Sequence, residues 1–312
     1  MTYPHAIVGG IALVSVSMVA LGAAKASPYR RKAELTIAKM TNWLLQPIPL
    51  RFLILASFSR HFGAFRYTTK LKLHAIERPE YGHCLLQAAR LAQKLGHTRI
   101  SAIEFGVGGG NGLVALERHA EHILAETGVG VEIYGFDTGV GTPAPRDHRD
   151  LPYLFQAGSF AMDERRLKAR LRAAKLLLGP VEETVGAFCE REKPPPIGFV
   201  SFDLDYYSST MAALKILDAA HTYLLPRVSC YFGDMVGDVD RAFSEFTGEL
   251  LAINDFNAAH DRVKLAQVRG LRFSHLWLPR LWHEQIFVAH LFQHSDYGRP
   301  ISPPQQAPLI DR

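Results

Sequence analysis

Three short apolar runs of the chain end in acidic residues or glycines, the residue types that bind a polar ligand most directly. The runs are residues 100–105, 131–136 and 197–202. The first contains Glu104 and continues into a loop with five glycines between residues 106 and 112. The second is followed by Asp137, and the third by Asp203 and Asp205. Carboxylates beside a glycine-rich loop are typical of a site for a nucleotide-like cofactor.

The chemistry of the loop depends on the missing side chains of its glycines. A residue without a Cβ atom can adopt positive φ, and it lets a ligand approach the backbone N–H groups at the start of the following helix. If the three runs are adjacent parallel strands, their carboxyl ends lie at one edge of the sheet, where Asp137 can accept hydrogen bonds from ribose hydroxyls. The spacing therefore predicts one ligand site at this edge.

An acid followed by Gly-x-Gly-x-Gly, here Glu104 with Gly106, Gly108 and Gly110, resembles the first motif of the class I S-adenosylmethionine-dependent methyltransferases. The resemblance covers roughly residues 78–297. Two further motifs resemble a narrower group, the macrocin-type sugar O-methyltransferases of macrolide biosynthesis. They are Phe-Asp-Leu-Asp-Tyr from residue 202 and Tyr-Phe-Gly-Asp from residue 231.

The resemblance implies S-adenosyl-L-methionine as the cofactor and assigns residues to hold it. Glu104 and the backbone of residues 106–110 would bind the methionine part, and Asp137 would bind the ribose hydroxyls. The other residues expected near the cofactor are Val181, Glu182 and Asp203. In methyl transfer the methyl carbon is already activated, so the protein mainly has to align a nucleophile with it and exclude water.

Asp203 and Asp205 are separated by one residue, so in an extended segment their side chains point to the same side. Asp205 is the expected general base toward an acceptor hydroxyl, with Asp203 as a second catalytic acid. Macrocin-type enzymes tend to carry two adjacent acids after the fifth strand and to hold magnesium with them, whereas this chain has Gly233 and Asp234. Asp203, Asp205 and Asp234 are the candidate Mg²⁺ ligands. Alternatively, these acids cap a helix or form salt bridges.

A long segment, residues 138–160, follows Asp137 and is expected to cover the acceptor, with Tyr153, Phe155 and Phe160 as an apolar lid. The expected partner is a small-molecule, sugar or lipid-linked acceptor, and no nucleic acid is expected. Two other functions remain open. One is a non-catalytic cofactor-binding or scaffold protein, and the other is an NAD(P)-dependent oxidoreductase, whose fingerprint requires a glycine where this chain has Asn111.

Strand-like and helix-like segments alternate along the body of the chain. The predicted helices are residues 81–95, 113–124, 210–224 and 239–254, and the predicted strands are 100–105, 131–136, 175–178, 197–202 and 228–232. This order predicts an α/β fold with a doubly wound, mostly parallel Rossmann-like sheet and helices on both faces. The resemblance adds a closing hairpin with a terminal antiparallel strand, which we place at residues 271–277 and 285–292.

The front of the chain differs from the body in charge and hydropathy. Residues 1–75 hold ten of the 35 basic residues but one of the 30 acidic ones, and residues 6–24 are uncharged and about long enough to cross a membrane as a helix. The expected domains are a hydrophobic anchor (1–28), a basic membrane-proximal helical region (29–77), the methyltransferase domain (78–297) and a Pro-rich tail (298–312). The basic residues after the anchor place the body in the cytoplasm. A cleaved signal peptide, a buried helix and a cytoplasmic chain are the alternatives.

Overall fold

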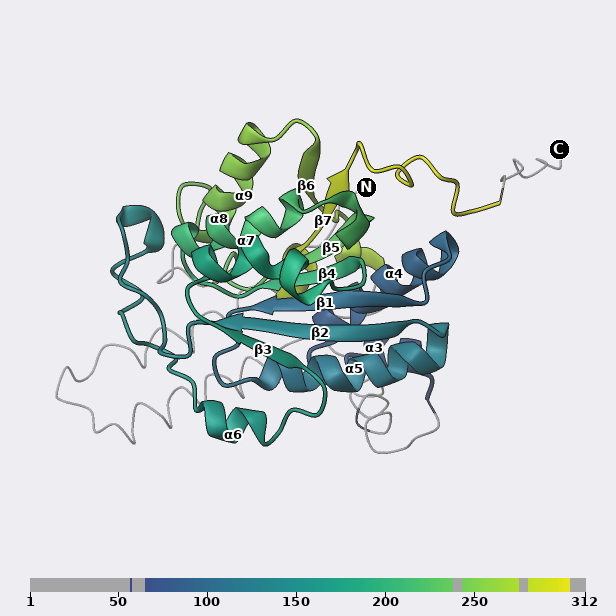
Figure 1. Cartoon of the computed structure of the whole chain (residues 1–312), viewed down its shortest axis with the longest axis horizontal. Coiled ribbons are helices and arrows are strands. Elements are labelled where there is room, and N and C mark those ends of the chain that lie inside the picture. The colour runs from purple at the N-terminus through teal and green to yellow at the C-terminus, as the bar shows by residue number, and fades with distance from the viewer. Residues whose placement is uncertain (1–56, 58–64, 238–242, 275–279, 304–312) are drawn as a thin grey trace, which may run out of the picture. The chain divides into compact units, whose positions relative to one another are not determined.

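One mixed sheet of seven strands organises the computed structural model, which describes residues 57, 65–237, 243–274 and 280–303 (Figure 1). The strand order is β3-β2-β1-β4-β5-β7-β6. The strands are β1 Arg99–Phe105, β2 Gly130–Asp137, β3 Lys175–Leu178, β4 Ile197–Phe202, β5 Leu224–Phe232, β6 Val263–Gln267 and β7 Ile286–Leu291. Strands β1 to β5 pair in parallel, and β7 pairs antiparallel with both β5 and β6. The predicted mostly parallel sheet with an antiparallel strand is confirmed.

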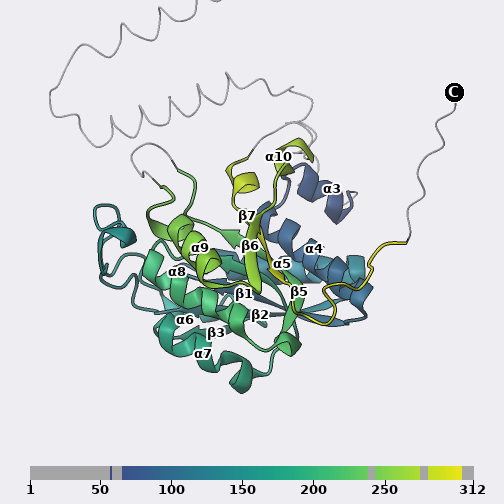
Figure 2. The same ribbon diagram turned by 90° about the horizontal axis from the view of Figure 1, so that it is seen from above.

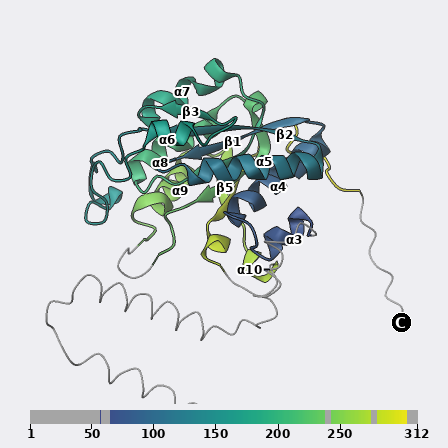
Figure 3. The ribbon, with the colours of Figure 1, turned by 90° about the horizontal axis from the view of Figure 1, so that it is seen from below.

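Helices cover both faces of this sheet. The helices are α3 Tyr67–Lys72, α4 Pro79–Leu95, α5 Asn111–Thr127, α6 Glu164–Lys168, α7 Val181–Glu192, α8 Tyr207–Leu214, α9 Gly248–Ala259 and α10 Leu271–Ser274. Helices α8 and α9 lie side by side on one face of the sheet, and α4 and α5 lie side by side on the other (Figures 2 and 3). The two larger apolar clusters of the described residues lie one on each face.

Helix α5 shows how local sequence sets these elements. It begins after Gly110 and ends before Gly128, and both glycines have a left-handed backbone that terminates a regular helix at low steric cost. Leu113, Leu116 and Ile123 recur at helical spacing and are fully buried against the sheet. The helices predicted at 81–95 and 113–124 are therefore confirmed, with the bounds of α4 and α5.

Three predicted elements are wrong in position. The segment predicted as a strand at 271–277 forms helix α10 over residues 271–274, because Gly270 turns the chain with φ +86°. Residues 275–279 lie outside the described residues. The partner of β7 is instead β6, where alternation buries Leu265 at one edge of the sheet.

The two late helices are also shorter than predicted. Helix α8 ends at Leu214, where the chain tightens into a 3₁₀ turn over Lys215–Asp218 and then becomes extended at Ala219. Helix α9 begins at Gly248 rather than near residue 239. Residues 238–242 lie outside the described part of the chain.

The predicted membrane anchor, residues 1–28, and most of the basic region that follows lie outside the described residues. Among the helices that the structure does describe, none has the length and apolar character needed to cross a membrane. Of the Pro-rich tail, residues 298–303 are described.

Candidate active site

A row of four phenylalanines brings the predicted site residues to one level. Each of β1, β2, β4 and β5 places a buried phenylalanine near its carboxyl end, and these are Phe105, Phe136, Phe202 and Phe232. Strand pairing sets Phe105 opposite both Phe136 and Phe202, and Phe202 opposite Phe232. Neighbouring ring centroids lie 4.7, 5.6 and 4.7 Å apart across the row. The residues that follow these rings, Gly106, Asp137, Asp203 and Gly233, therefore start at the same height.

A cavity of about 910 Å³ lies above this row, at the carboxyl ends of the parallel strands. Eight of the predicted site residues line it: Gly106, Gly108, Asp137, Val181, Glu182, Asp203, Asp205 and Asp234. Glu104 and Gly110 are not among the lining residues. A ligand site at this edge is what a doubly wound sheet provides, because neighbouring loops separate there.

The glycine turn forms the floor of the cavity beside Asp137. A Cβ atom on Gly106 would lie 1.8 Å from the carbonyl oxygen of Asp203, so no side chain fits there. A Cβ atom on Gly108 would meet nothing within 4 Å, so the space beside its Cα atom is open. The N–H group of Gly108 donates to Asp137 Oδ2 at 2.8 Å, and that of Gly139 donates to Oδ1 at 2.7 Å. Asp137 thus holds the turn in place.

Glu104 lies beneath the turn, fully buried, instead of facing the cavity. The Tyr81 hydroxyl donates to Glu104 Oε1 at 2.7 Å and accepts from Ser201 Oγ at 2.8 Å. Burial raises the pKa of the Glu104 carboxyl to about 8. A Cβ atom on Gly112 would lie 1.7 Å from Glu104 Oε1, so that glycine is needed for the carboxyl to fit. Glu104 supports the turn from below, and its direct contact with a cofactor stays a prediction.

Gly110 has a different function from the other glycines of the loop. Its φ is +78°, and a Cβ atom there would lie 2.0 Å from Leu167 Cδ1 of α6. The residue therefore allows α5 to start close to α6.

The three predicted acids lie close together in the cavity wall next to Gly106, although their geometry differs from the prediction. Strand β4 ends at Phe202, and Asp205 has φ +61°, so the alternation of an extended segment does not apply to Asp203 and Asp205. Burial, followed by the charge of Asp234, raises the pKa of Asp203 to about 7. Burial, followed by the charge of Asp205, raises the pKa of Asp234 to about 7.

A fourth acid, Glu249, was missed from the sequence. It is fully buried in the first turn of α9, and its Oε2 atom accepts a hydrogen bond from the backbone N–H of Asp234 at 2.8 Å. The only sequence signal was an acid at the start of a helix, which is common because it complements the helix dipole.

The metal prediction finds no support in this arrangement. A side chain at position 233, where the resembling enzymes carry an acid, would put its Cβ atom 2.3 Å from Asp203 Oδ1. Within the described residues, no group of three or more histidines, cysteines, aspartates or glutamates is arranged to hold a metal ion. The roles of Asp203, Asp205 and Asp234 as Mg²⁺ ligands remain untested predictions, and no step is derived through a metal.

The long segment 138–160 projects beside the carboxyl ends of the strands (Figure 1, in dark teal), and its role as a cover over the acceptor stays a prediction. Phe155 and Phe160 line the cavity, whereas Tyr153 is exposed and does not. Phe155 is buried against Tyr206, with ring centroids 5.9 Å apart. The segment therefore contributes a packed aromatic wall at Phe155 rather than three equivalent lid residues.

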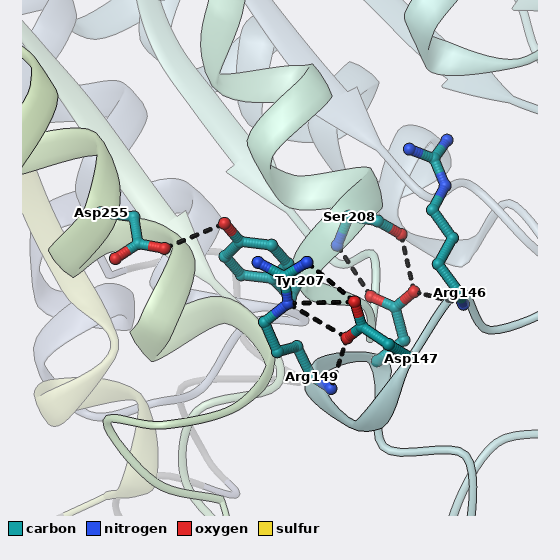
Figure 4. A network of polar contacts seen from close by, with 7 residues as sticks. Arg146, Asp147, Arg149, Tyr207, Ser208 and Asp255 are labelled. Carbon is teal, nitrogen blue, oxygen red and sulfur yellow. Dashed lines mark hydrogen bonds and ion pairs between the residues drawn. The ribbon is translucent and has the colours of Figure 1, made fainter.

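A polar network fastens this segment to α8 and α9 (Figure 4). The buried Asp150 carboxylate accepts hydrogen bonds from the backbone N–H groups of Arg146 and Ser208 and from the Ser208 hydroxyl, at 2.8 to 2.9 Å. The Arg149 guanidinium lies 4.4 Å from the centre of the Tyr207 ring, and the Tyr207 hydroxyl donates to Asp255 at 2.9 Å. Asp150 thereby caps α8, whose own first residues supply no side-chain cap.

The comparisons with known proteins identify methyltransferases among the solved structures. No protein-family model matches the sequence, and no curated protein matches it. The calicheamicin methyltransferase CalS11 is 19% identical over 86% of this chain and 95% of its own, with a TM-score of 0.47. The O-methyltransferase NovP is 14% identical over 58% and 72%, with a TM-score of 0.43.

A third solved structure is MycE of the mycinamycin biosynthetic pathway in complex with Mg and SAH. It is 16% identical over 78% of this chain and 56% of its own, with a TM-score of 0.35. All three proteins are methyltransferases, and all three TM-scores are below 0.5.

Proposed function

We propose that this chain is an S-adenosyl-L-methionine-dependent methyltransferase that methylates an oxygen atom of a small-molecule acceptor. The observation that carries the proposal is the pairing of Gly108 with Asp137 in a cavity that also holds Asp203 and Asp205. An open backbone turn beside a ribose-binding acid suits a nucleoside, and the carboxyls next to it suit a hydroxyl that must lose a proton.

The residues of the chain divide the cavity into two parts. The cofactor part consists of the turn at Gly106 and Gly108, the ribose acid Asp137, and Val181 and Glu182 at the start of α7. We assign the adenine to the last two residues because they follow β3, which is adjacent to β2 in the sheet. The acceptor part consists of Asp205, the start of α8 and the wall at Phe155.

The bound cofactor supplies a methyl group already activated by a sulfonium ion. The chain has to hold the acceptor oxygen within about 3 to 3.5 Å of that carbon, and proximity of this kind supplies much of the rate enhancement. The cofactor, held at Gly108 and Asp137, would transfer its methyl group to the acceptor oxygen and leave as the thioether, and the Asp205 carboxylate would take the hydroxyl proton. The segment 138–160 limits the access of water to this end.

Calorimetric titration of the purified chain with S-adenosylhomocysteine tests the proposal directly. We expect saturable binding by the product and no binding of reduced nicotinamide dinucleotide, which separates a methyltransferase from an oxidoreductase of similar fold. An assay with methyl-labelled cofactor against fractionated metabolites then distinguishes an enzyme from a non-catalytic binding protein. Absence of product binding at millimolar concentration would contradict the proposal.

We also propose, from the sequence alone, that the front of the chain attaches the protein to a membrane. The supports are the uncharged residues 6–24 and the basic excess that follows them, because apolar burial and attraction to anionic lipid together anchor better than either alone. The full chain should stay with membranes after a high-salt wash, and deletion of residues 1–28 should release most of it. Recovery of the intact chain in the soluble fraction at ordinary salt would contradict this attachment.

A further inference from the structure

Arg78 is one of three described non-glycine residues of the cavity wall, with Phe160 and Asp205, whose φ is positive. It has φ 43° and ψ 61°, in the left-handed region, and it directly precedes Pro79 at the start of α4. A residue other than glycine is sterically disfavoured in this conformation, and such residues persist where the surrounding structure imposes them. Strain of this kind often marks a residue whose side chain has a function.

A buried histidine imposes this conformation. His119 of α5 lies with Nε2 3.0 Å from the carbonyl oxygen of Glu77 and 3.1 Å from that of Arg78. Its Nδ1 atom lies 2.9 Å from the Tyr67 hydroxyl, so a neutral ring that carries its proton on Nε2 satisfies all three contacts. His119 is 1% exposed. The segment before α4 is therefore anchored to the helix that follows the glycine turn.

The anchored backbone presents the Arg78 guanidinium to the cavity. Its central carbon lies 4.9 Å from the centre of the Tyr81 ring, and Nη1 lies 3.3 Å from the Tyr81 hydroxyl and 3.9 Å from Asp203 Oδ2. Both polar contacts of the guanidinium within the described residues use Nη1. The Nη2 and Nε groups are thus available for a bidentate contact with a planar anion.

Arg78 and Asp203 together form a pair of opposite charges at the carboxyl ends of β1 and β4, each about one third exposed. A cation and an anion separated in this way match the carboxylate and the ammonium group of an amino acid. The ribose acid Asp137 lies two strands away on β2, and two strand spacings amount to about 10 Å. This separation is comparable to the reach of a methionyl group from its ribose.

On the basis of the proposed function, we infer that Arg78 binds the carboxylate of the methionine part of the cofactor, while Asp203 receives its ammonium group. Arg146, the other arginine of the cavity wall, is paired with Glu182 on the adenine side. It is therefore poorly placed for this contact. His119 is a positioning residue for Arg78.

The test compares two ligands that differ by one carboxylate. The full-length wild-type chain is titrated by calorimetry with S-adenosylhomocysteine and with its decarboxylated analogue, S-adenosyl-3-thiopropylamine. The wild type should bind the first ligand about 10- to 100-fold more tightly, which is the range for a hydrogen-bonded charge pair. Arg78→Ala should lower this ratio to about one to three by weakening only the carboxylate-bearing ligand.

Two further variants separate binding from folding. Arg78→Gly removes the same side chain but relieves the left-handed strain, so it should lower the ratio without lowering the melting temperature. Arg118→Ala is the matched control, because Arg118 pairs with Glu77 of the same segment and does not line the cavity. Its ratio should equal that of the wild type.

Each other outcome overturns the inference. A wild-type ratio near one would mean that the cavity does not recognise the carboxylate, and an unchanged ratio in both Arg78 variants would assign that recognition elsewhere. Equal weakening of both ligands would show that Arg78 acts on the nucleoside or on the fold. Failure of the wild type to bind either ligand would contradict the proposed function itself.

Discussion

At the scale of single residues, two glycines of the same turn differ in what their missing side chains permit. Gly106 has its backbone packed against Asp203, so Gly106→Ala should force the loops apart and destabilise the fold by several kcal/mol, as overpacking and a strained φ do together. Gly108 faces open space, so Gly108→Ala should lose only about 1 kcal/mol from its φ of +48°.

Cofactor affinity, measured per folded molecule, should show the opposite ranking: Gly108→Ala should lose more affinity than Gly106→Ala. Urea unfolding measures the stability, and calorimetry with S-adenosylhomocysteine measures the affinity. Gly108→Ala should weaken binding about tenfold or more because a methyl group occupies the ligand's path. Unchanged affinity in folded Gly108→Ala protein would show that the ligand does not approach this backbone.

Asp205 is the residue for which we predict an effect on rate. Asp205→Asn should lower the methylation rate by about 10² to 10⁴, the usual contribution of a general base, and should change cofactor affinity much less. Single-turnover assays with labelled cofactor measure the first effect, and calorimetry measures the second. Asp218→Asn, an exposed acid paired with His260, is the control. Equal rates in Asp205→Asn and wild type would remove Asp205 from the mechanism.

At the scale of secondary-structure elements, the attachment of segment 138–160 to α8 should control acceptor binding. Asp150→Ala removes a buried carboxylate that accepts three hydrogen bonds. It should cost about 2 to 4 kcal/mol in unfolding free energy, because the donors left behind are partly buried. The KM for the acceptor should rise, while the cofactor affinity should change little.

Tyr207→Phe tests the same attachment more gently. It deletes the hydrogen bond to Asp255 but keeps the ring under Arg149, so its expected cost is about 0.5 to 1.5 kcal/mol. Kinetics with the acceptor varied at saturating cofactor measure the KM of both variants, and urea unfolding measures their stability. An unchanged KM in folded Asp150→Ala protein would mean that the segment does not contact the acceptor.

The contact between α5 and the start of α4 should make stability depend on pH. Burial lowers the pKa of His119 from 6.5 to about 4. The unfolded chain therefore binds a proton in the window between these values while the folded chain does not, and stability falls as pH drops from about 6.5 to 4. The groups facing the ring are Tyr67, Glu77 and His122.

Urea unfolding at pH 7 and pH 5 measures this effect. Wild type should lose about 2 kcal/mol more than His119→Gln between the two values, because glutamine keeps a donor for the carbonyl oxygens but does not titrate. Substitution of His97, which lies away from the buried contact, is the control. The same loss in wild type and His119→Gln would assign the pH dependence to other groups. The buried Glu104 acts in the opposite sense, since its pKa of about 8 makes stability fall as pH rises through the range above 4.5.

At the scale of the whole molecule, the chain divides into two compact units, Met1–Pro49 and Leu50–Arg312, and the described sheet lies within the second. A chain that begins at residue 50 should therefore unfold cooperatively. Its Tm should lie within about 4 °C of the full chain, the shift expected for 1 kcal/mol in a domain of this size. Its affinity for S-adenosylhomocysteine should also be unchanged. Thermal unfolding followed by circular dichroism measures the first property, and a non-cooperative transition would show that the front of the chain is part of the folding unit.

The sequence by itself determined the five parallel strands, helices α4 and α5, and the edge of the sheet where the candidate ligand site lies. It could do so because each depends on local patterns: β4 is a continuous apolar run, α5 lies between two glycines, and Asp137 directly follows an apolar run. The repetition of phenylalanine before glycine or aspartate was also visible in the sequence. Its meaning depends on strand register, which a single run does not reveal.

Only the tertiary structure decided how the acids are used. Glu104 and Asp137 both lie near the end of a strand, yet one is buried under Tyr81 and the other holds the open turn, because neighbours distant in the sequence surround each of them. Glu249 lies in the first turn of α9 and Arg78 directly precedes α4, in segments that carry no motif, so long-range packing alone places them at the site. The spacing of residues along the chain reveals local structure and candidate site residues. Burial, charge pairing and strain arise from contacts between distant segments.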